Sequence, residues 1–168
     1  MIVVSNTSPL TNLAAIGQFD LLRQMYGQLY IPEGVWSELN AGGKRWPGCA
    51  EVEAANWIER RRVENQPLVT ALMRDLDRGE AESADKEHPI VLAVEMGADL
   101  LLLDEKEGRH AAMRFDLVII GIVGLLLAAK VSGKVESVQS SLDKLRQEAG
   151  FFLSETLYQA ILEQAEES

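Results

Sequence analysis

Two short apolar runs each end at a polar residue that could take part in catalysis or metal binding. Residues 2–5 are followed by Asn6, and residues 100–103 are followed by Asp104. In an open parallel sheet, ligands bind outside the carboxyl ends of the strands. We therefore expect Asn6 and Asp104 to line one cleft although they lie far apart in the sequence. This pattern indicates an enzyme, with the complication that an acid would be the natural residue at position 6.

Three further acids could join this cleft. Glu38 lies on the helix expected after a short second strand, and Glu80 and Glu82 lie at an expected helix start. Clustered carboxylates repel one another unless a cation neutralises them. Mg²⁺, and similarly Mn²⁺, prefers oxygen ligands and can activate water for phosphodiester hydrolysis. The sequence predicts a metal site with Asn6, Glu38, Glu82 and Asp104 as ligands and with Glu80 as a further catalytic residue.

Each of these residues also has a simpler structural interpretation. Asp104 could cap the helix that follows it, and Glu38 could be an exposed helix residue. Glu80 and Glu82 could favour a helix N-terminus through its dipole. Asn6 could serve only as a turn or cap residue. Their joint placement after strands and at helix starts is stronger evidence than any one of them alone.

Apolar strands that alternate with helical patterns position these residues. This order predicts an α/β fold, a three-layer α/β/α arrangement with a mainly parallel sheet. Glycine and proline mark many of the boundaries. The expected strands are 2–5, 29–31, 58–63, 100–103 and 117–120, and the main expected helices are 8–16, 20–26, 32–39, 51–57, 90–96, 106–115, 122–131, 135–149 and 154–165.

Length and composition limit the class of protein. The 168 residues suit a single domain, 1–168, with the C-terminal helices 135–168 packing on it. The formal net charge of −10 argues against broad electrostatic binding to nucleic acid. The single cysteine, Cys49, excludes an intrachain disulfide and is typical of a reducing cytoplasm. We interpret Cys49 as a loop residue. The longest apolar stretch, 117–129, contains two glycines and is too short to predict a membrane-spanning helix.

Other chemistries lack their sequence signals. The chain has no glycine-rich dinucleotide motif, phosphate-binding loop or nucleophile elbow. His88 and His110 are isolated, so no zinc site is expected. The densest basic run, 60–62, could contact phosphate or simply be a solvated segment.

Six segments spread over essentially the whole chain share one family pattern, namely residues 3–10, 31–39, 76–82, 97–105, 108–109 and 150–154. Together they resemble PIN-like domains, and the nearest resemblance is to an uncharacterised prokaryotic branch related to VapC-type toxin ribonucleases. The resemblance implies a metal-dependent ribonuclease fold that is often dimeric and often paired with an antitoxin. By position, Glu38 matches the helix acid of the family, Asp104 the acid after the later strand, and Glu80 and Glu82 the acidic helix start.

Two departures from the family pattern bear on activity. Asn6 stands where nuclease members usually have Asp, so one negative charge is lost and metal affinity is expected to fall. Residues 83–89 form an apparent insertion directly after Glu82. This insertion could displace Glu80 and Glu82 from the cleft, or let Asp85 or Glu87 substitute for them.

The leading hypothesis is a Mg²⁺- or Mn²⁺-dependent endoribonuclease of the toxin–antitoxin type. It would act on RNA in the cytoplasm as a homodimer, with an antitoxin protein as partner. One rival is a catalytically weakened or inactive PIN-like protein that binds protein or RNA. Another is a different metal-dependent phosphoester hydrolase on a similar sheet.

Overall fold

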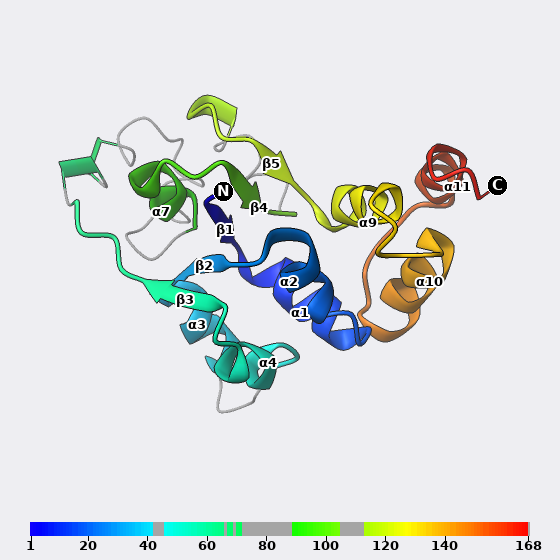
Figure 1. Cartoon of the computed structure of the whole chain (residues 1–168), viewed down its shortest axis with the longest axis horizontal. Helices are drawn as coiled ribbons and strands as arrows, with labels where there is room; N and C mark the ends of the chain where they lie inside the picture. Colours follow the sequence, from blue (N-terminus) through cyan, green and yellow to red (C-terminus); the bar gives the residue numbers. More distant parts are fainter. Residues whose placement is uncertain (42–45, 66, 69, 72–88, 105–112, 168) are drawn as a thin grey trace.

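A five-stranded parallel sheet forms the centre of the molecule (Figure 1). The computed structural model describes residues 1–41, 46–65, 67–68, 70–71, 89–104 and 113–167. Its strand order is β3-β2-β1-β4-β5. The strands are β1 (Val3–Ser5), β2 (Leu29–Pro32), β3 (Ile58–Arg61), β4 (Leu100–Leu102) and β5 (Ile119–Ile120).

The two apolar runs that precede Asn6 and Asp104 are neighbouring strands at the centre of this sheet. Strand β1 pairs with β4 in a register that sets Val3 opposite Leu100 and Ser5 opposite Leu102. The β1 side chains are buried, and β4 is buried except for its partly exposed first residue. A central strand is covered on both faces, which explains why these segments are continuously apolar rather than alternating. The predicted strands are confirmed here.

Helices cover both faces of the sheet, as predicted for the three-layer α/β/α fold. Helix α7 (Pro89–Met96) packs on the face formed by Val4 and Leu101. The opposite face, which includes Val3 and Leu102, packs against the first helices of the chain and α9. The helices of this second layer are α1 (Thr7–Ala15), α2 (Asp20–Tyr26), α3 (Glu33–Leu39), α4 (Cys49–Ala54) and α9 (Ile122–Val131).

The last two helices extend beyond the sheet and are held at their ends by side chains. Helix α10 (Val138–Glu148) is capped by Ser137 and helix α11 (Glu155–Gln164) by Ser154, each through a side-chain oxygen that accepts a backbone N–H. Glu167 accepts hydrogen bonds from Lys130 Nζ at 2.7 Å and from Val138 N at 2.8 Å. This carboxylate, close to the C-terminus, thereby joins α9 to the start of α10.

Several boundaries differ from the prediction. Helix α4 lies at 49–54 rather than 51–57, because Ala55 is extended and Trp57 O accepts a hydrogen bond from Leu29 N. Cys49 is therefore the first residue of a helix, fully buried, with Sγ donating to Asn40 Oδ1 at 3.2 Å. Its interpretation as a loop residue is wrong.

Some predicted elements lie outside the described residues. These include most of the helix expected at 106–115 and all of the apparent insertion at 83–89 except Pro89, which begins α7. Among the residues that the structure describes, no helix is both long enough and apolar enough to cross a membrane.

Candidate metal centre

Asn6 lies directly after β1 and is almost completely buried, with 4% of its surface exposed. Its backbone N–H donates to Leu102 O at 2.9 Å, which continues the pairing of β1 with β4. Its carbonyl accepts a hydrogen bond from Ser5 Oγ at 2.9 Å. Asn6 occupies the N-cap position of α1, but its side chain makes no capping hydrogen bond. The Asn6 backbone is thus held at the carboxyl edge of the sheet, and its side chain does not cap the helix.

Asp104 lies at the same edge, two residues beyond β4. Leu103 N donates to Ile120 O at 3.0 Å, so the chain stays paired with the neighbouring strand up to this point. Asp104 Oδ1 accepts a hydrogen bond from Ile122 N at 2.8 Å, while Oδ2 is shielded from solvent. Asp104 also makes a further interaction. The carboxylate therefore supports the first turn of α9, a helix much later in the chain than the one that the sequence suggested it could cap.

Glu38 is tied to the end of β1 by a hydrogen bond between side chains. Thr7 Oγ1 donates to Glu38 Oε2 at 2.6 Å. Glu38 is exposed near the end of α3, and Thr7 is the first residue of α1, directly after Asn6. Thr7 is not among the residues predicted from the sequence, although its hydroxyl next to the predicted ligand Asn6 was a usable signal.

Three segments of the chain therefore meet near the carboxyl ends of β1 and β4. Asn6 and Asp104 follow paired strands, and Thr7 joins Glu38 to Asn6. The atoms of Asn6, Glu38 and Asp104 that could bind a metal ion are all oxygens, one from an amide and the others from carboxylates. Oxygen ligands suit Mg²⁺ or Mn²⁺. Among the described residues there is no group of three or more His, Cys, Asp or Glu side chains that could hold a metal ion. Glu80 and Glu82 lie outside the described residues.

Asp99 lies at the other edge of the sheet and serves the backbone. Its Oδ2 accepts a hydrogen bond from Ile2 N at 2.6 Å, just before β1 and β4 begin. Asp99 directly precedes β4 and therefore lies at the opposite edge of the sheet from Asp104.

Comparison with known proteins identifies the family. A family model, DUF3368, described as a PIN domain, matches residues 2–167. No curated protein and no solved structure matches the chain. PIN domains have a nuclease-like fold and generally use divalent metal ions, in keeping with the parallel sheet and the oxygen donors described above. The match spans nearly the whole chain, and the protein therefore belongs to the DUF3368 family of PIN domains.

Proposed function

We propose that this protein is a Mg²⁺- or Mn²⁺-dependent ribonuclease that hydrolyses RNA phosphodiesters at the carboxyl edge of its sheet. The observation that carries the proposal is the Thr7–Glu38 hydrogen bond of 2.6 Å, which holds an acid of α3 against the residue that directly follows Asn6. Asp104 follows the strand that pairs with β1. Two acids and an amide from distant parts of the chain thus share one edge.

Each residue contributes differently to the proposed site. Glu38 and Asp104 would hold the ion through carboxylate oxygens, and Asn6 through its neutral amide oxygen. When bound, the ion supplies charge stabilisation and lowers the pKa of a coordinated water. Thr7 fixes one oxygen of Glu38 and leaves the other to turn toward a ligand. Ile122 N donates to one oxygen of Asp104 and sets this carboxylate against the positive end of the α9 dipole.

One further acid would complete the proposed metal site. It would be Glu80 or Glu82, with Asp85 or Glu87 as substitutes.

The biological role that we propose follows from the family. The protein would act as the toxin of a toxin–antitoxin pair, in the cytoplasm and as a homodimer. An antitoxin would be its protein partner and RNA its substrate.

A second candidate function is a PIN-domain protein that binds protein or RNA without cleaving it. The observation that favours it is Asn6, because an amide at this buried position brings no negative charge to a cation. Only two of the predicted acids, Glu38 and Asp104, lie within the part of the chain that the structure describes. A site formed by these described residues alone would bind Mg²⁺ weakly.

Metal titration combined with RNA cleavage distinguishes the two functions. The full chain is titrated with Mn²⁺ by calorimetry and then incubated with a structured RNA labelled at one end. We expect saturable Mn²⁺ binding and cleavage that stops on addition of a chelator. Glu38→Gln should lower both metal affinity and cleavage, because the amide keeps an acceptor for Thr7 but removes the charge.

Glu163→Gln provides the matched control, since Glu163 is an exposed acid on α11. This variant should bind Mn²⁺ and cleave RNA as the unmodified chain does. If Mn²⁺ does not bind and no RNA is cut, the ribonuclease proposal fails. RNA binding without cleavage, unaffected by Glu38→Gln, would support the binding module instead.

A further inference from the structure

Strand β3 is an edge of the sheet and pairs only with β2 among the described residues. Leu29 N donates to Trp57 O, whereas Ile58 N donates to Ala55 O instead of to β2. In a parallel ladder, inward and outward backbone groups alternate along a strand. The N–H and C=O of Glu59 and Arg61 therefore point toward β2, and those of Arg60 point outward. The outer side of β3 thus presents backbone groups to which another strand could bond.

Three consecutive arginines lie along this edge in a chain of net charge −10. Arg60 lies over the Trp36 ring at 4.7 Å, and Arg61 over the Tyr30 ring at 5.4 Å. Trp36 belongs to the α3 layer and Tyr30 to the face that packs on α7. The two guanidinium groups therefore occupy opposite faces of the sheet. Glu59 pairs with Arg61 at 2.9 Å, which leaves the strand and Arg62 with a net positive charge.

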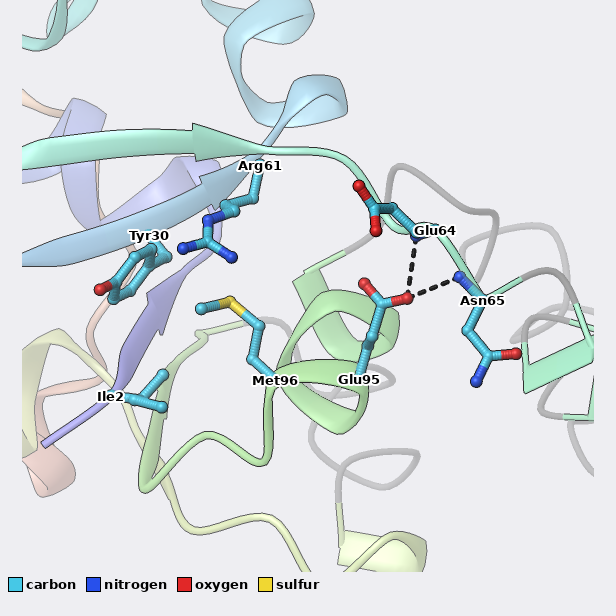
Figure 2. A pocket seen from close by; sticks show the side chains of 7 residues that line it. All are labelled: Ile2, Tyr30, Arg61, Glu64, Asn65, Glu95 and Met96. Atoms are coloured by element: carbon cyan, nitrogen blue, oxygen red, sulfur yellow. Dashed lines mark hydrogen bonds between the residues drawn. The ribbon is translucent and has the colours of Figure 1, made fainter.

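Both faces of this edge are hollowed. On the α7 face, a hollow of about 620 Å³ has apolar walls from Ile2, Tyr30 and Met96 and is bordered by Arg61 (Figure 2). Glu64 and Glu95 lie at its other end, where Glu95 Oε1 accepts backbone hydrogen bonds from Glu64 N and Asn65 N (Figure 2). This hollow leaves room for side chains beside β3 on that face.

The opposite face has a smaller hollow. It measures about 270 Å³ and is lined by Trp36, Val52, Ile58 and Arg60, with Glu53 and Ala55. Successive side chains of a strand point to opposite faces. A strand added outside β3 would therefore direct alternate side chains toward the two hollows.

We propose that the outer edge of β3 binds an extended, acidic segment of a partner protein as an additional strand. Main-chain hydrogen bonds to Arg60 would supply affinity, as in other cases of strand addition. Neighbouring acids on the segment would face Arg60 on one side of the sheet and Arg61 on the other. Charged side chains on an edge oppose pairing with neutral or like-charged strands, which restricts the edge to acidic partners.

A protein segment fits this surface better than a nucleic acid does. Single-stranded nucleic acid lies along a positively charged groove on one surface. The guanidinium groups of Arg60 and Arg61 lie on opposite faces, so one phosphate chain would not meet both. The outward N–H and C=O of Arg60 can also form hydrogen bonds with the main chain of a polypeptide. This proposal does not depend on nuclease activity.

Amide hydrogen exchange measured by NMR on the full chain tests the proposal. The probe is a blocked peptide, Thr-Val-Glu-Glu-Val-Thr, and we expect it to slow exchange of the Arg60 amide at least about tenfold at saturation. The same peptide with alternate amide nitrogens methylated keeps its charges but cannot pair, and should not bind. Arg60→Gln combined with Arg61→Gln should weaken peptide binding about fivefold. Arg62→Gln, which lies beyond the strand, should also weaken peptide binding.

Lys134→Gln combined with Lys144→Gln is the charge-matched control, because both lysines are exposed and far along the chain from β3. That variant should bind the peptide within about twofold of the unmodified chain. Equal binding of the methylated peptide would overturn the proposal. So would binding of octauridylate, but not of the peptide, in an arginine-dependent manner. Concentration-dependent protection of the Arg60 amide in the protein alone would assign the edge to a second copy and also overturn it.

Discussion

Carboxylates at the two ends of this molecule are used in different ways. Near the C-terminus, Glu167 accepts hydrogen bonds from Lys130, Ser137, Val138 and Gln139. At the carboxyl edge of the sheet, Thr7 donates to one oxygen of Glu38, and Ile122 N donates to one oxygen of Asp104, which makes a further interaction as well. Both oxygens of Glu167 are thus committed to the fold. Glu38 is exposed, and its second oxygen is the one that we propose for a ligand.

The pKa of Glu167 reflects this commitment. Burial raises it, but the hydrogen bonds from Lys130, from the backbone of Gln139 and Val138, and from Ser137 outweigh that effect and lower it from 4.5 to about 2. A site that should bind a cation needs the opposite arrangement, in which protein donors leave negative charge uncompensated. The comparison therefore separates an acid that stabilises the fold from the acids that we propose as metal ligands.

The largest effect is expected at Asp104. Asp104→Asn keeps an oxygen acceptor for Ile122 N but removes the charge, so RNA cleavage should fall by about 100-fold, equivalent to about 2.7 kcal/mol in the barrier. The thermal midpoint should change little. Measurement of cleavage rates and of Tm on the same preparation checks this. Unchanged cleavage would assign Asp104 to α9 alone.

A companion substitution separates the two roles of Asp104. Asp104→Ala removes the acceptor as well as the charge and should lower stability by about 1 kcal/mol, the usual cost of losing a helix cap. Chemical denaturation of the Asn and Ala variants measures the difference. Equal stability of the two variants would contradict a capping role.

At the other end of the molecule, Glu167→Gln should lower the free energy of unfolding by about 2 kcal/mol, because the charged acceptor of several donors is lost. RNA cleavage below the unfolding transition should be unchanged. Urea denaturation and cleavage assays check the two parts, with Glu163→Gln as the control. A loss of cleavage without a loss of stability would overturn the division between the two regions.

The lowered pKa of Glu167 should make the stability of the folded protein depend on pH. Its pKa is lower in the folded protein than in the unfolded chain, so its stabilisation is present above about pH 4.5 and is lost as the pH falls toward 2. Glu167→Gln should remove this part of the acid sensitivity. Urea unfolding between pH 2 and 6 gives the comparison, and parallel curves for the two proteins would contradict it.

Asn6→Asp should raise Mn²⁺ affinity about tenfold, because it adds a negative charge to the proposed site. Without metal the same substitution should lower Tm, since a charge would be placed at a nearly buried position. Calorimetry and thermal unfolding with and without Mn²⁺ measure both effects. No change in affinity would place Asn6 outside the site.

Thr7→Val should have the smallest effect. It removes the donor to Glu38 Oε2 while keeping a β-branched side chain at the start of α1. Cleavage and Mn²⁺ affinity should fall by about threefold, in line with loss of one exposed charge-assisted hydrogen bond. An effect as large as that of Glu38→Gln would show that Thr7 does more than orient the acid.

The parts of the fold that followed from sequence were those fixed by local chemistry. The strands before Asn6 and Asp104 were predicted because central strands in a parallel sheet are continuously apolar. Helix α2 was predicted at 20–26, as observed, and Gly27 ends it with φ of +76°. At that φ a residue with a side chain would be strained.

The parts that could not be predicted depend on contacts between distant segments. Helix α10 begins at Val138 rather than at residue 135. At this start, Ser137 and Glu167 accept hydrogen bonds from N–H groups of the first turn of the helix. Strand β5 is shorter than the predicted 117–120, because only Ile119 and Ile120 pair in register with β4. The hydrogen bonds from Thr7 to Glu38 and from Ile122 N to Asp104 likewise join residues that are far apart in the sequence. No local sequence pattern predicts that these residues are close in space.

Paramagnetic broadening by Mn²⁺ tests the central claim most directly. NMR spectra of the full chain are recorded with substoichiometric Mn²⁺. We predict that signals from Asn6, Glu38 and Asp104 broaden together, while the amides of Val138 and Gln139 beside Glu167 stay sharp. Broadening that is absent, or that is confined to one of the three segments, would contradict a shared metal site at the carboxyl ends of β1 and β4.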